Sequence, residues 1–213
     1  MDKIKKICSN LNEYFWLFVI GSIIGCFYEM ILEFFRNGNI YLHKGLIYGP
    51  FCQVYGIGLV VMVILFKKVK NKTVLFVGGF ISGGILEYLL SYIQEIVFHS
   101  KSWDYSNYPI NFSGRTSFFH MFFWGIFVLL IMSYLYPFLH KKLEIFKTHY
   151  GKIITCICFV LMLLDIIISI VAAIRYYDRR MNVSTLGNID AFLDAKYPDD
   201  RIESIYRMSV QLD

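Results

Sequence analysis

Long apolar runs alternate with short polar connections along most of this 213-residue chain. Five runs reach or approach the roughly 20 residues that a helix needs to cross a bilayer. They cover residues 14–35, 49–66, 73–98, 116–139 and 153–174. The pattern predicts an all-α integral membrane protein with five transmembrane helices.

The chain becomes polar after the fifth run, which predicts a transmembrane bundle over residues 1–175 and a separate tail over residues 176–213. Ile189, Phe192 and Leu193, and then the apolar positions after Pro198, suggest two short amphipathic helices in this tail. These helices could lie on the membrane surface, bind a partner or cap the bundle.

Composition agrees with a membrane protein, because 57% of the residues are hydrophobic, 17% are charged and the mean hydropathy is +0.53. The net charge of +5 would suggest nucleic acid in a soluble chain. Here the cations lie mostly between apolar runs, so they indicate orientation, and no nucleic-acid partner is predicted.

Lysines gather in alternate connections. They are Lys3, Lys5 and Lys6, then Lys67, Lys68, Lys70 and Lys72, then Lys141, Lys142, Lys147 and Lys152. The positive-inside rule predicts that this side is cytoplasmic, which makes the chain a multi-pass protein of the cell membrane with its N-terminus inside. Arg175, Arg179 and Arg180 follow the fifth run on the opposite side. Either the early helices dominate the orientation or the tail re-enters the membrane.

A phrase of small and acidic residues occurs twice, each time at a spacing of four that places it on one helix face. The copies are Gly21, Gly25, Glu29 and Glu33, and Gly79, Gly83, Glu87, Ser91 and Glu95. The interval from Gly45 to Gly56 also recurs from Gly114 to Gly125. The sequence therefore predicts a tandem duplication of a helical hairpin over residues 12–66 and 69–139.

Glu29 and Glu87 are the strongest candidates for chemistry, since both lie roughly 20 Å from the inner ends of their helices in a core about 30 Å thick. Carboxylates at that depth are rare and generally pair with something. The available partners are Arg115, Lys44, His120, Tyr48, Tyr55 and each other. Such a site could carry protons, coordinate a cation or receive a basic group of a ligand.

Other candidates carry a structural alternative. Glu95 is near the outer interface and could be a solvated helix end, and Asp165, with Ser169 one turn on, could be a hydrogen bond between helices. Asp104 belongs to an aromatic loop, residues 99–113, that suits an interface anchor or a substrate lid. The ligand- or ion-binding candidates together are Glu29, Glu87, Glu95, Arg115, Lys44, Tyr48, His120, Asp104 and Asp165.

The stretch from Lys44 to Gly56 is rich in Gly and aromatic residues and contains Pro50, so we expect the backbone to bend or unwind there. Free amides in the bend, with Lys44 and Arg115, could hold an anionic group. A simple loop-to-helix transition is the alternative. The five cysteines are odd in number and lack CxxC spacing, which favours free thiols, and neither a metal site nor a cofactor is predicted.

Several motifs together resemble one bacterial membrane family. They are Glu29, Tyr48-Gly49-Pro50-Phe51, Val54-Tyr55-Gly56, Leu86-Glu87-Tyr88, Glu95, Trp103-Asp104-Tyr105-Ser106, Gly114-Arg115, Phe123-Trp124-Gly125 and the pair Asp165 and Ser169. On these motifs the chain is similar to the CmpB-like "Putative ABC-transporter type IV" proteins over residues 14–169. The chain departs from that pattern at Gln53, where a proline is expected, and at Leu90, where a threonine is usual.

The resemblance and the carboxylates together predict a permease-like transport subunit whose partners are membrane lipids, a separate ATPase or further copies of itself. Any ATP-driven role needs a separate ATPase, because the chain has no GxxxxGK[ST] phosphate loop. The main alternative is a membrane-embedded enzyme that grips a lipid or polyprenyl-phosphate headgroup with Arg115 and Lys44. No nucleophile motif or metal triad is present, which favours transport, and the catalytic residues of an enzyme would be unknown. A scaffold or sensor subunit with a docking tail is the third hypothesis.

Overall fold

The computed structural model of the chain describes residues 2–38, 40, 42, 44–185, 187–206 and 210–211, with side chains between residues 10 and 206. Cys8 and the lysines before residue 10 lie outside the described side chains. Helices dominate the described part, and four are long and apolar enough to cross a membrane. They are Asn10–Asn37 of α1 (Asp2–Asn37), Lys72–Phe98 (α3), Phe118–Lys147 and His149–Arg180 (α6). The structure is therefore an all-helical membrane protein.

The second apolar run forms a shorter helix than residues 49–66 predicted. Helix α2 spans Gln53–Phe66, and its 14 residues reach about 21 Å, short of the roughly 30 Å hydrocarbon core. Gly49 has a left-handed backbone with φ of +73° and Cys52 is extended. The Gly49-Pro50 sequence thus delays the helix, in agreement with the bend expected after Lys44.

The fourth run is continuous but irregular. It consists of α4 (Phe118–Leu130), a π-helical turn (Ile131–Leu135), α5 (Tyr136–Leu143) and a 3-10 turn (Glu144–Lys147). Pro137 is the second residue after the π turn. Because proline has no amide hydrogen and its ring crowds the carbonyl four residues earlier, the hydrogen-bond ladder widens before it.

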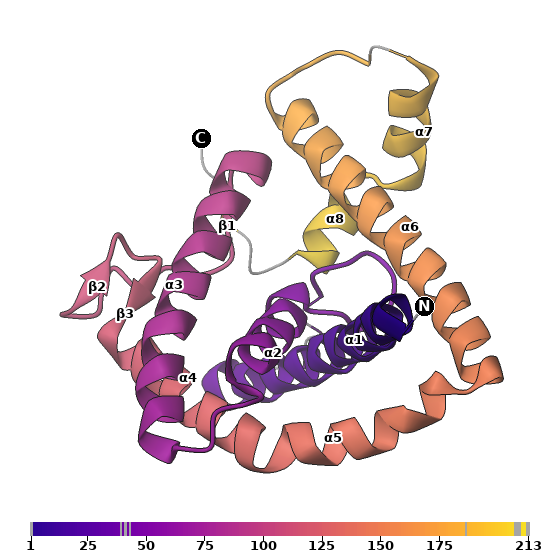
Figure 1. The fold of residues 1–213 in the computed structure, drawn as a ribbon. Helices are drawn as coiled ribbons and strands as arrows, with labels where there is room; N and C mark the ends of the chain where they lie inside the picture. The colour runs from indigo at the N-terminus through magenta and orange to yellow at the C-terminus, as the bar shows by residue number, and fades with distance from the viewer. Residues whose placement is uncertain are drawn as a thin grey trace.

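The helices pair as neighbours in sequence, α1 with α2 and α3 with α4 (Figure 1). Figure 1 shows α1 and α2 at the centre, α3 and α4 on one side and α6 on the other, with α5 crossing between the two sides. One apolar cluster, built around Leu17 and Val63, joins α1 and α2 to α5. A second, around Met62 and Val128, joins α2 to α3 and α4.

Short strands pair in the loop between α3 and α4 and after α8 (Asp199–Ile205). Strand β2 (Asn111–Phe112) pairs antiparallel with β3 (Thr116–Ser117), and β1 (Ser100–Lys101) pairs antiparallel with β4 (Val210–Gln211). The expected tail helices are present as α7 (Asn188–Lys196) and α8 (Asp199–Ile205), with Pro198 directly before α8.

The tail helices fold back onto α6 and the loop before α2. Leu193, Tyr197 and Ile202 pack with Ala172 and Tyr176 of α6 and with Ile47 of the loop. Arg175 and Arg179, whose position disagreed with the positive-inside rule, form ion pairs with Asp194 and Asp199 of this tail. Their charges are thus largely neutralised within the protein.

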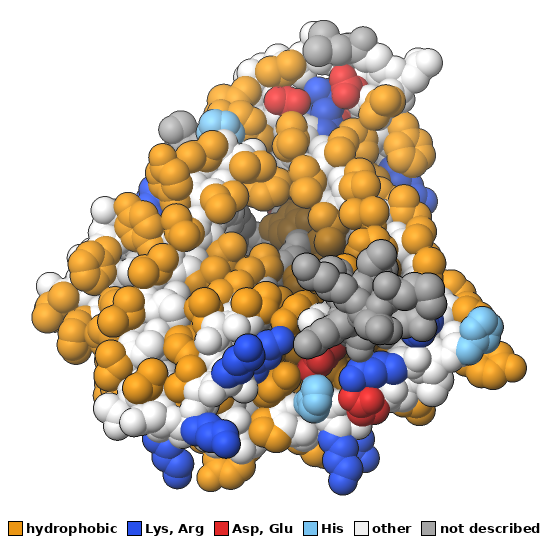
Figure 2. Space-filling view, viewed as in Figure 1, with side chains coloured by type: hydrophobic (Ala, Val, Ile, Leu, Met, Phe, Trp, Pro, Cys, Tyr) orange, Lys and Arg blue, Asp and Glu red, His pale blue; other side chains and the backbone are white. Residues whose placement is uncertain are grey.

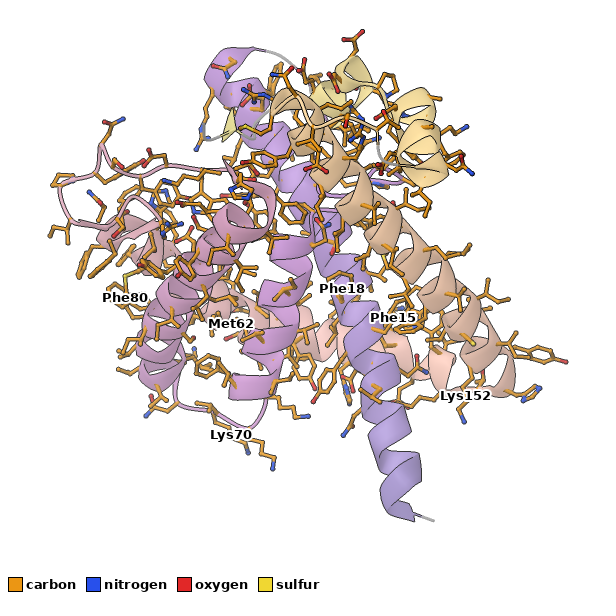
Figure 3. The ribbon with its side chains drawn as sticks, turned by 90° about the horizontal axis from the view of Figure 1, so that it is seen from above. Phe15, Phe18, Met62, Lys70, Phe80 and Lys152 are labelled. Carbon is orange, nitrogen blue, oxygen red and sulfur yellow. The ribbon has the colours of Figure 1, made fainter. Side chains whose placement is uncertain are left out.

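The surface matches the membrane assignment. Figure 2 shows hydrophobic side chains over most of one face. Figure 3 shows Lys70 and Lys152 toward the same end of the molecule, with α7 and α8 at the opposite end. We call the first of these the lysine end and the second the tail end.

Candidate functional site

Glycines of α1 and α3 lie against aromatic rings of α2 and α4, the helices that follow them. A Cβ atom on Gly25 of α1 would overlap the ring of Tyr55 in α2, and one on Gly83 of α3 would overlap the ring of Trp124 in α4. Small residues at these points let the paired backbones approach closely. The same contacts set Tyr55 and Trp124 beside the glutamates one turn further on.

Glu29 receives a hydrogen bond from the hydroxyl group of Tyr55, one of the partners that the sequence offered. The ring of Tyr28 packs edge-on against Tyr55, with centroids 5.8 Å apart, and against Phe127 of α4 at 6.1 Å. The Glu29 side chain itself is half-buried. Its carboxylate is therefore held by one hydroxyl within an aromatic surrounding.

Glu87 is more deeply enclosed, with a relative exposure of 7%. The hydroxyl of Thr116 donates to one carboxylate oxygen at 2.7 Å, and that of Tyr105 donates to the other at 3.1 Å. Among the described residues no cation forms an ion pair with it. Glu87 is thus a buried carboxyl group satisfied by neutral donors alone.

The loop that supplies these donors is pinned at several points. The indole of Trp103 donates to the carbonyl of Arg115 at 2.8 Å, and the amide of Tyr105 donates to the carbonyl of Gly114 at 2.7 Å. Burial, and then the charge and hydrogen bond of Glu87, raise the pKa of the Tyr105 phenol well above its usual range. Tyr105 therefore stays neutral and keeps its proton for Glu87.

Arg115 pairs with Glu95 rather than with Glu29 or Glu87. The guanidinium lies 2.6 Å from the Glu95 carboxylate and donates to Ser91 at 3.4 Å. The guanidinium also lies over the rings of Tyr88 and Tyr92 in α3, the helix that carries Glu95. The Arg115 charge is thus compensated and shielded by aromatic faces.

His120 continues the cluster around the loop. Its ring stacks on Tyr105, with centroids 3.6 Å apart and planes at 13°. Its Nδ1 atom hydrogen-bonds the hydroxyl of Ser117 at 2.8 Å. His120 therefore packs against the face of Tyr105, and its hydrogen bonds within the described part of the chain reach Ser117 and neither glutamate.

Asp104 shapes the loop from its exposed side. Its carboxylate accepts hydrogen bonds from the Ser106 amide at 2.9 Å and from the Ser106 hydroxyl at 2.5 Å, which lower the pKa of this carboxyl group. A Cβ atom on Gly114, where φ is +67°, would overlap Asp104. The geometry gives Asp104 a role in the turn.

Asp165 and Tyr48 form a different cluster, at the junction of α6 with the loop before α2. Asp165 accepts from the Tyr48 amide at 3.1 Å, and Ser169 accepts from the Ile47 amide at 2.9 Å. The Tyr48 hydroxyl meets that of Tyr197 in the tail at 2.9 Å. Lys44 begins this loop within electrostatic range of Asp165. The Ile47 and Tyr48 amides thus donate to side chains of α6, and Arg115 belongs to the other cluster.

The structure thus brings Glu87, Glu95, Arg115 and His120 together around the loop of residues 99–117, and leaves Glu29 with Tyr55 and Asp165 with Tyr48. Sequence reasoning missed Thr116 and Tyr105 as partners of Glu87. The available signal was the position of Thr116 directly after Arg115 and of Tyr105 directly after Asp104, two residues that the sequence had marked as candidates. Within the described residues no three His, Cys, Asp or Glu side chains gather as a metal site would need.

The fold and this polar cluster define a helical integral membrane protein with a buried carboxyl group in a span. Comparison with protein families then places it: a family model described as "Putative ABC-transporter type IV" matches residues 16–170, and the chain belongs to this family. No match was found among curated proteins or among solved structures. All nine candidate residues lie inside the matched range, and α7 and α8 lie beyond it.

Proposed function

We propose that this chain is a transport component of the cell membrane that binds a proton or a small cation at Glu87. The observation that carries this proposal is a 7%-exposed carboxyl group in an apolar helix with two neutral hydrogen-bond donors. Burying a charge without a counter-charge is expensive, so such groups mark ion or proton pathways in membranes.

The hydroxyl partners fit exchange of a proton or cation. A hydroxyl group can donate to a carboxylate and can accept from a protonated carboxyl group, so Thr116 and Tyr105 satisfy Glu87 in either state. A fixed arginine at the same place would favour the ionised state alone. Arg115 is instead compensated by Glu95 at 2.6 Å, which also weakens the alternative of a phosphate-gripping enzyme.

The finer architecture of the proposal is a five-span permease-like subunit built from two duplicated hairpins, α1–α2 and α3–α4, that works with a separate ATPase. Matching contacts support the duplication. Gly25 meets Tyr55 as Gly83 meets Trp124, and Gly56 meets Phe18 as Gly125 meets Phe76. In this arrangement Glu29 is the counterpart of Glu87 and forms the second half of the pathway.

The experiment is infrared difference spectroscopy of the purified, reconstituted protein between mildly acidic and mildly alkaline buffers, and again with Na⁺ or K⁺ added. We expect a band of a protonated carboxyl group that responds to pH or cation and disappears in Glu87→Gln. Glutamine keeps the shape and an acceptor for the hydroxyls, so the variant should fold.

Asp200→Asn, which removes an exposed carboxylate of the tail, serves as the control and should leave the band unchanged. Thr116→Val gives a second readout, because loss of one donor should shift the band without removing it. An unchanged band in Glu87→Gln and Thr116→Val would overturn the assignment.

A further inference from the structure

A cavity of about 1010 Å³ lies between α1, α2 and α6, away from the glutamates. Its walls are apolar for most of their length, with Phe15 and Phe18 from α1, Val60 from α2 and Phe159 from α6. We refer to it as the α1–α6 cavity. Its volume is at the upper end of the range for ligand sites in proteins.

We infer that the α1–α6 cavity is a binding site for an anionic phospholipid, with the acyl chains along the apolar wall and the phosphate at the lysine end. Figure 3 shows Phe15 and Phe18 on α1 and Lys152 near the start of α6, on the same side of the molecule as Lys70.

The length of the cavity suits an acyl chain. Its α6 wall runs from Lys152 to Ile166, a rise of about 21 Å. One leaflet of hydrocarbon is about 15 Å thick, half of the 30 Å core. A lipid whose headgroup is level with Lys152 would therefore lie along the α6 wall for the whole length of its acyl region.

The positive charge at the lysine end of the cavity favours an anionic headgroup. Lys147 and Lys152 both line the cavity there, next to the N-terminal turn of α6, whose amides carry partial positive charge. Lys147 also pairs with the exposed Glu144, whereas Lys152 has no ion-pair partner within the described residues. A zwitterionic headgroup would bring its own cation against these lysines, so a net negative lipid fits better.

The wall beside the lysines is polar and already satisfied. Thr155 accepts from the Trp16 indole at 2.9 Å and donates to Asn12 at 2.9 Å, and Asn12 donates to the Phe146 carbonyl at 2.7 Å. This network fixes α1 against the start of α6. The lysine ammonium groups are left as the donors for a headgroup.

The test is titration of the detergent-purified protein with dioleoyl phosphatidylglycerol and, separately, dioleoyl phosphatidylcholine, followed by native mass spectrometry and by thermal unfolding. We expect preferential retention of phosphatidylglycerol and a higher unfolding midpoint with it. Lys152→Gln should weaken the apparent affinity for phosphatidylglycerol about fivefold, from the usual contribution of one lysine to an anionic lipid surface. Lys147→Gln should have a smaller effect because Glu144 shares its charge. Lys141→Gln, an exposed lysine of α5 outside the cavity, is the matched control.

A second readout covers variants that fold poorly. Cys156 lines the cavity, so with the other cysteines replaced by serine, phosphatidylglycerol should slow its reaction with a maleimide more than phosphatidylcholine does. Equal retention of the two lipids, or equal loss in Lys152→Gln and Lys141→Gln, would overturn the inference. Protection of Cys156 that depends on protein concentration and not on lipid would instead identify a second copy of the chain as the occupant.

Discussion

A carboxyl group inside a membrane needs partners, and the two repeated glutamates find them differently. Glu29 accepts a hydrogen bond from the hydroxyl of Tyr55 in the next helix. Glu87 instead accepts hydrogen bonds from Tyr105 and Thr116, which belong to the loop between α3 and α4. The sequence identified both glutamates because charge in an apolar run is visible from residue types alone. The partners of Glu87 in the loop could not be predicted, because they depend on the conformation of residues 99–117 and helical periodicity gives no information about a loop.

Gly83 provides the clearest packing test at this scale. A side chain there has to displace the Trp124 ring, whose Cβ and Cγ atoms already occupy the space. We expect Gly83→Ala to lower the free energy of unfolding by about 1–3 kcal/mol, as overpacking usually does. The measurement is thermal unfolding in detergent followed by tryptophan fluorescence.

Gly187→Ala is the control, because a Cβ atom there meets nothing within 4 Å. If Gly83→Ala and Gly187→Ala were equally stable, the close approach of α3 and α4 at this point would be refuted.

Among the elements, the four longest helices were predictable because each has an uninterrupted apolar run bounded by polar connections. Helix α2 was predicted too long, since hydropathy alone does not register that Gly49 turns left-handed and that Pro50 follows it. The two tail helices were visible in the periodicity and in Pro198. Their docking onto α6 was not, because it depends on residues about 20 positions apart meeting in space.

Asp194 makes that docking sensitive to acid. Hydrogen bonds from Arg175, and then from Arg179 and Thr185, hold the pKa of this carboxyl group well below its ordinary value of 3.8. Because the pKa is lower in the folded state, this group stabilises the docked tail above pH 3.8 and the contribution is lost as pH falls through the folded-state pKa.

We therefore expect amide hydrogens of α7 to exchange faster, relative to their intrinsic rates, as the pH is lowered below 3.8. In Asp194→Asn the faster exchange should already be present at neutral pH, and the acid response should be small. Hydrogen exchange with mass spectrometry measures both. Exchange of α7 in Asp194→Asn that matched both the native protein and Asp200→Asn at neutral pH would contradict the ion-pair account.

At the scale of the whole molecule, the polar features separate toward two ends. Lys70 and Lys152 lie toward the lysine end, and the tail helices lie toward the other (Figure 3). The positive-inside rule predicts few cations at the tail end, yet Arg175 and Arg179 lie there. Both form ion pairs with carboxylates of the tail, which explains why they are compatible with that side. An N-terminus inside and a tail outside thus remain the orientation that we propose.

The measurement that tests the central claim most directly is charge movement by the purified protein reconstituted on a solid-supported membrane, after a rapid change of pH or of Na⁺ or K⁺ concentration. The account predicts a transient current in the native protein and in Asp200→Asn, and its loss in Glu87→Gln at equal amounts of folded protein. A current of the same size in Glu87→Gln would show that Glu87 is a structural carboxyl group and that the transport proposal has to rest on another site.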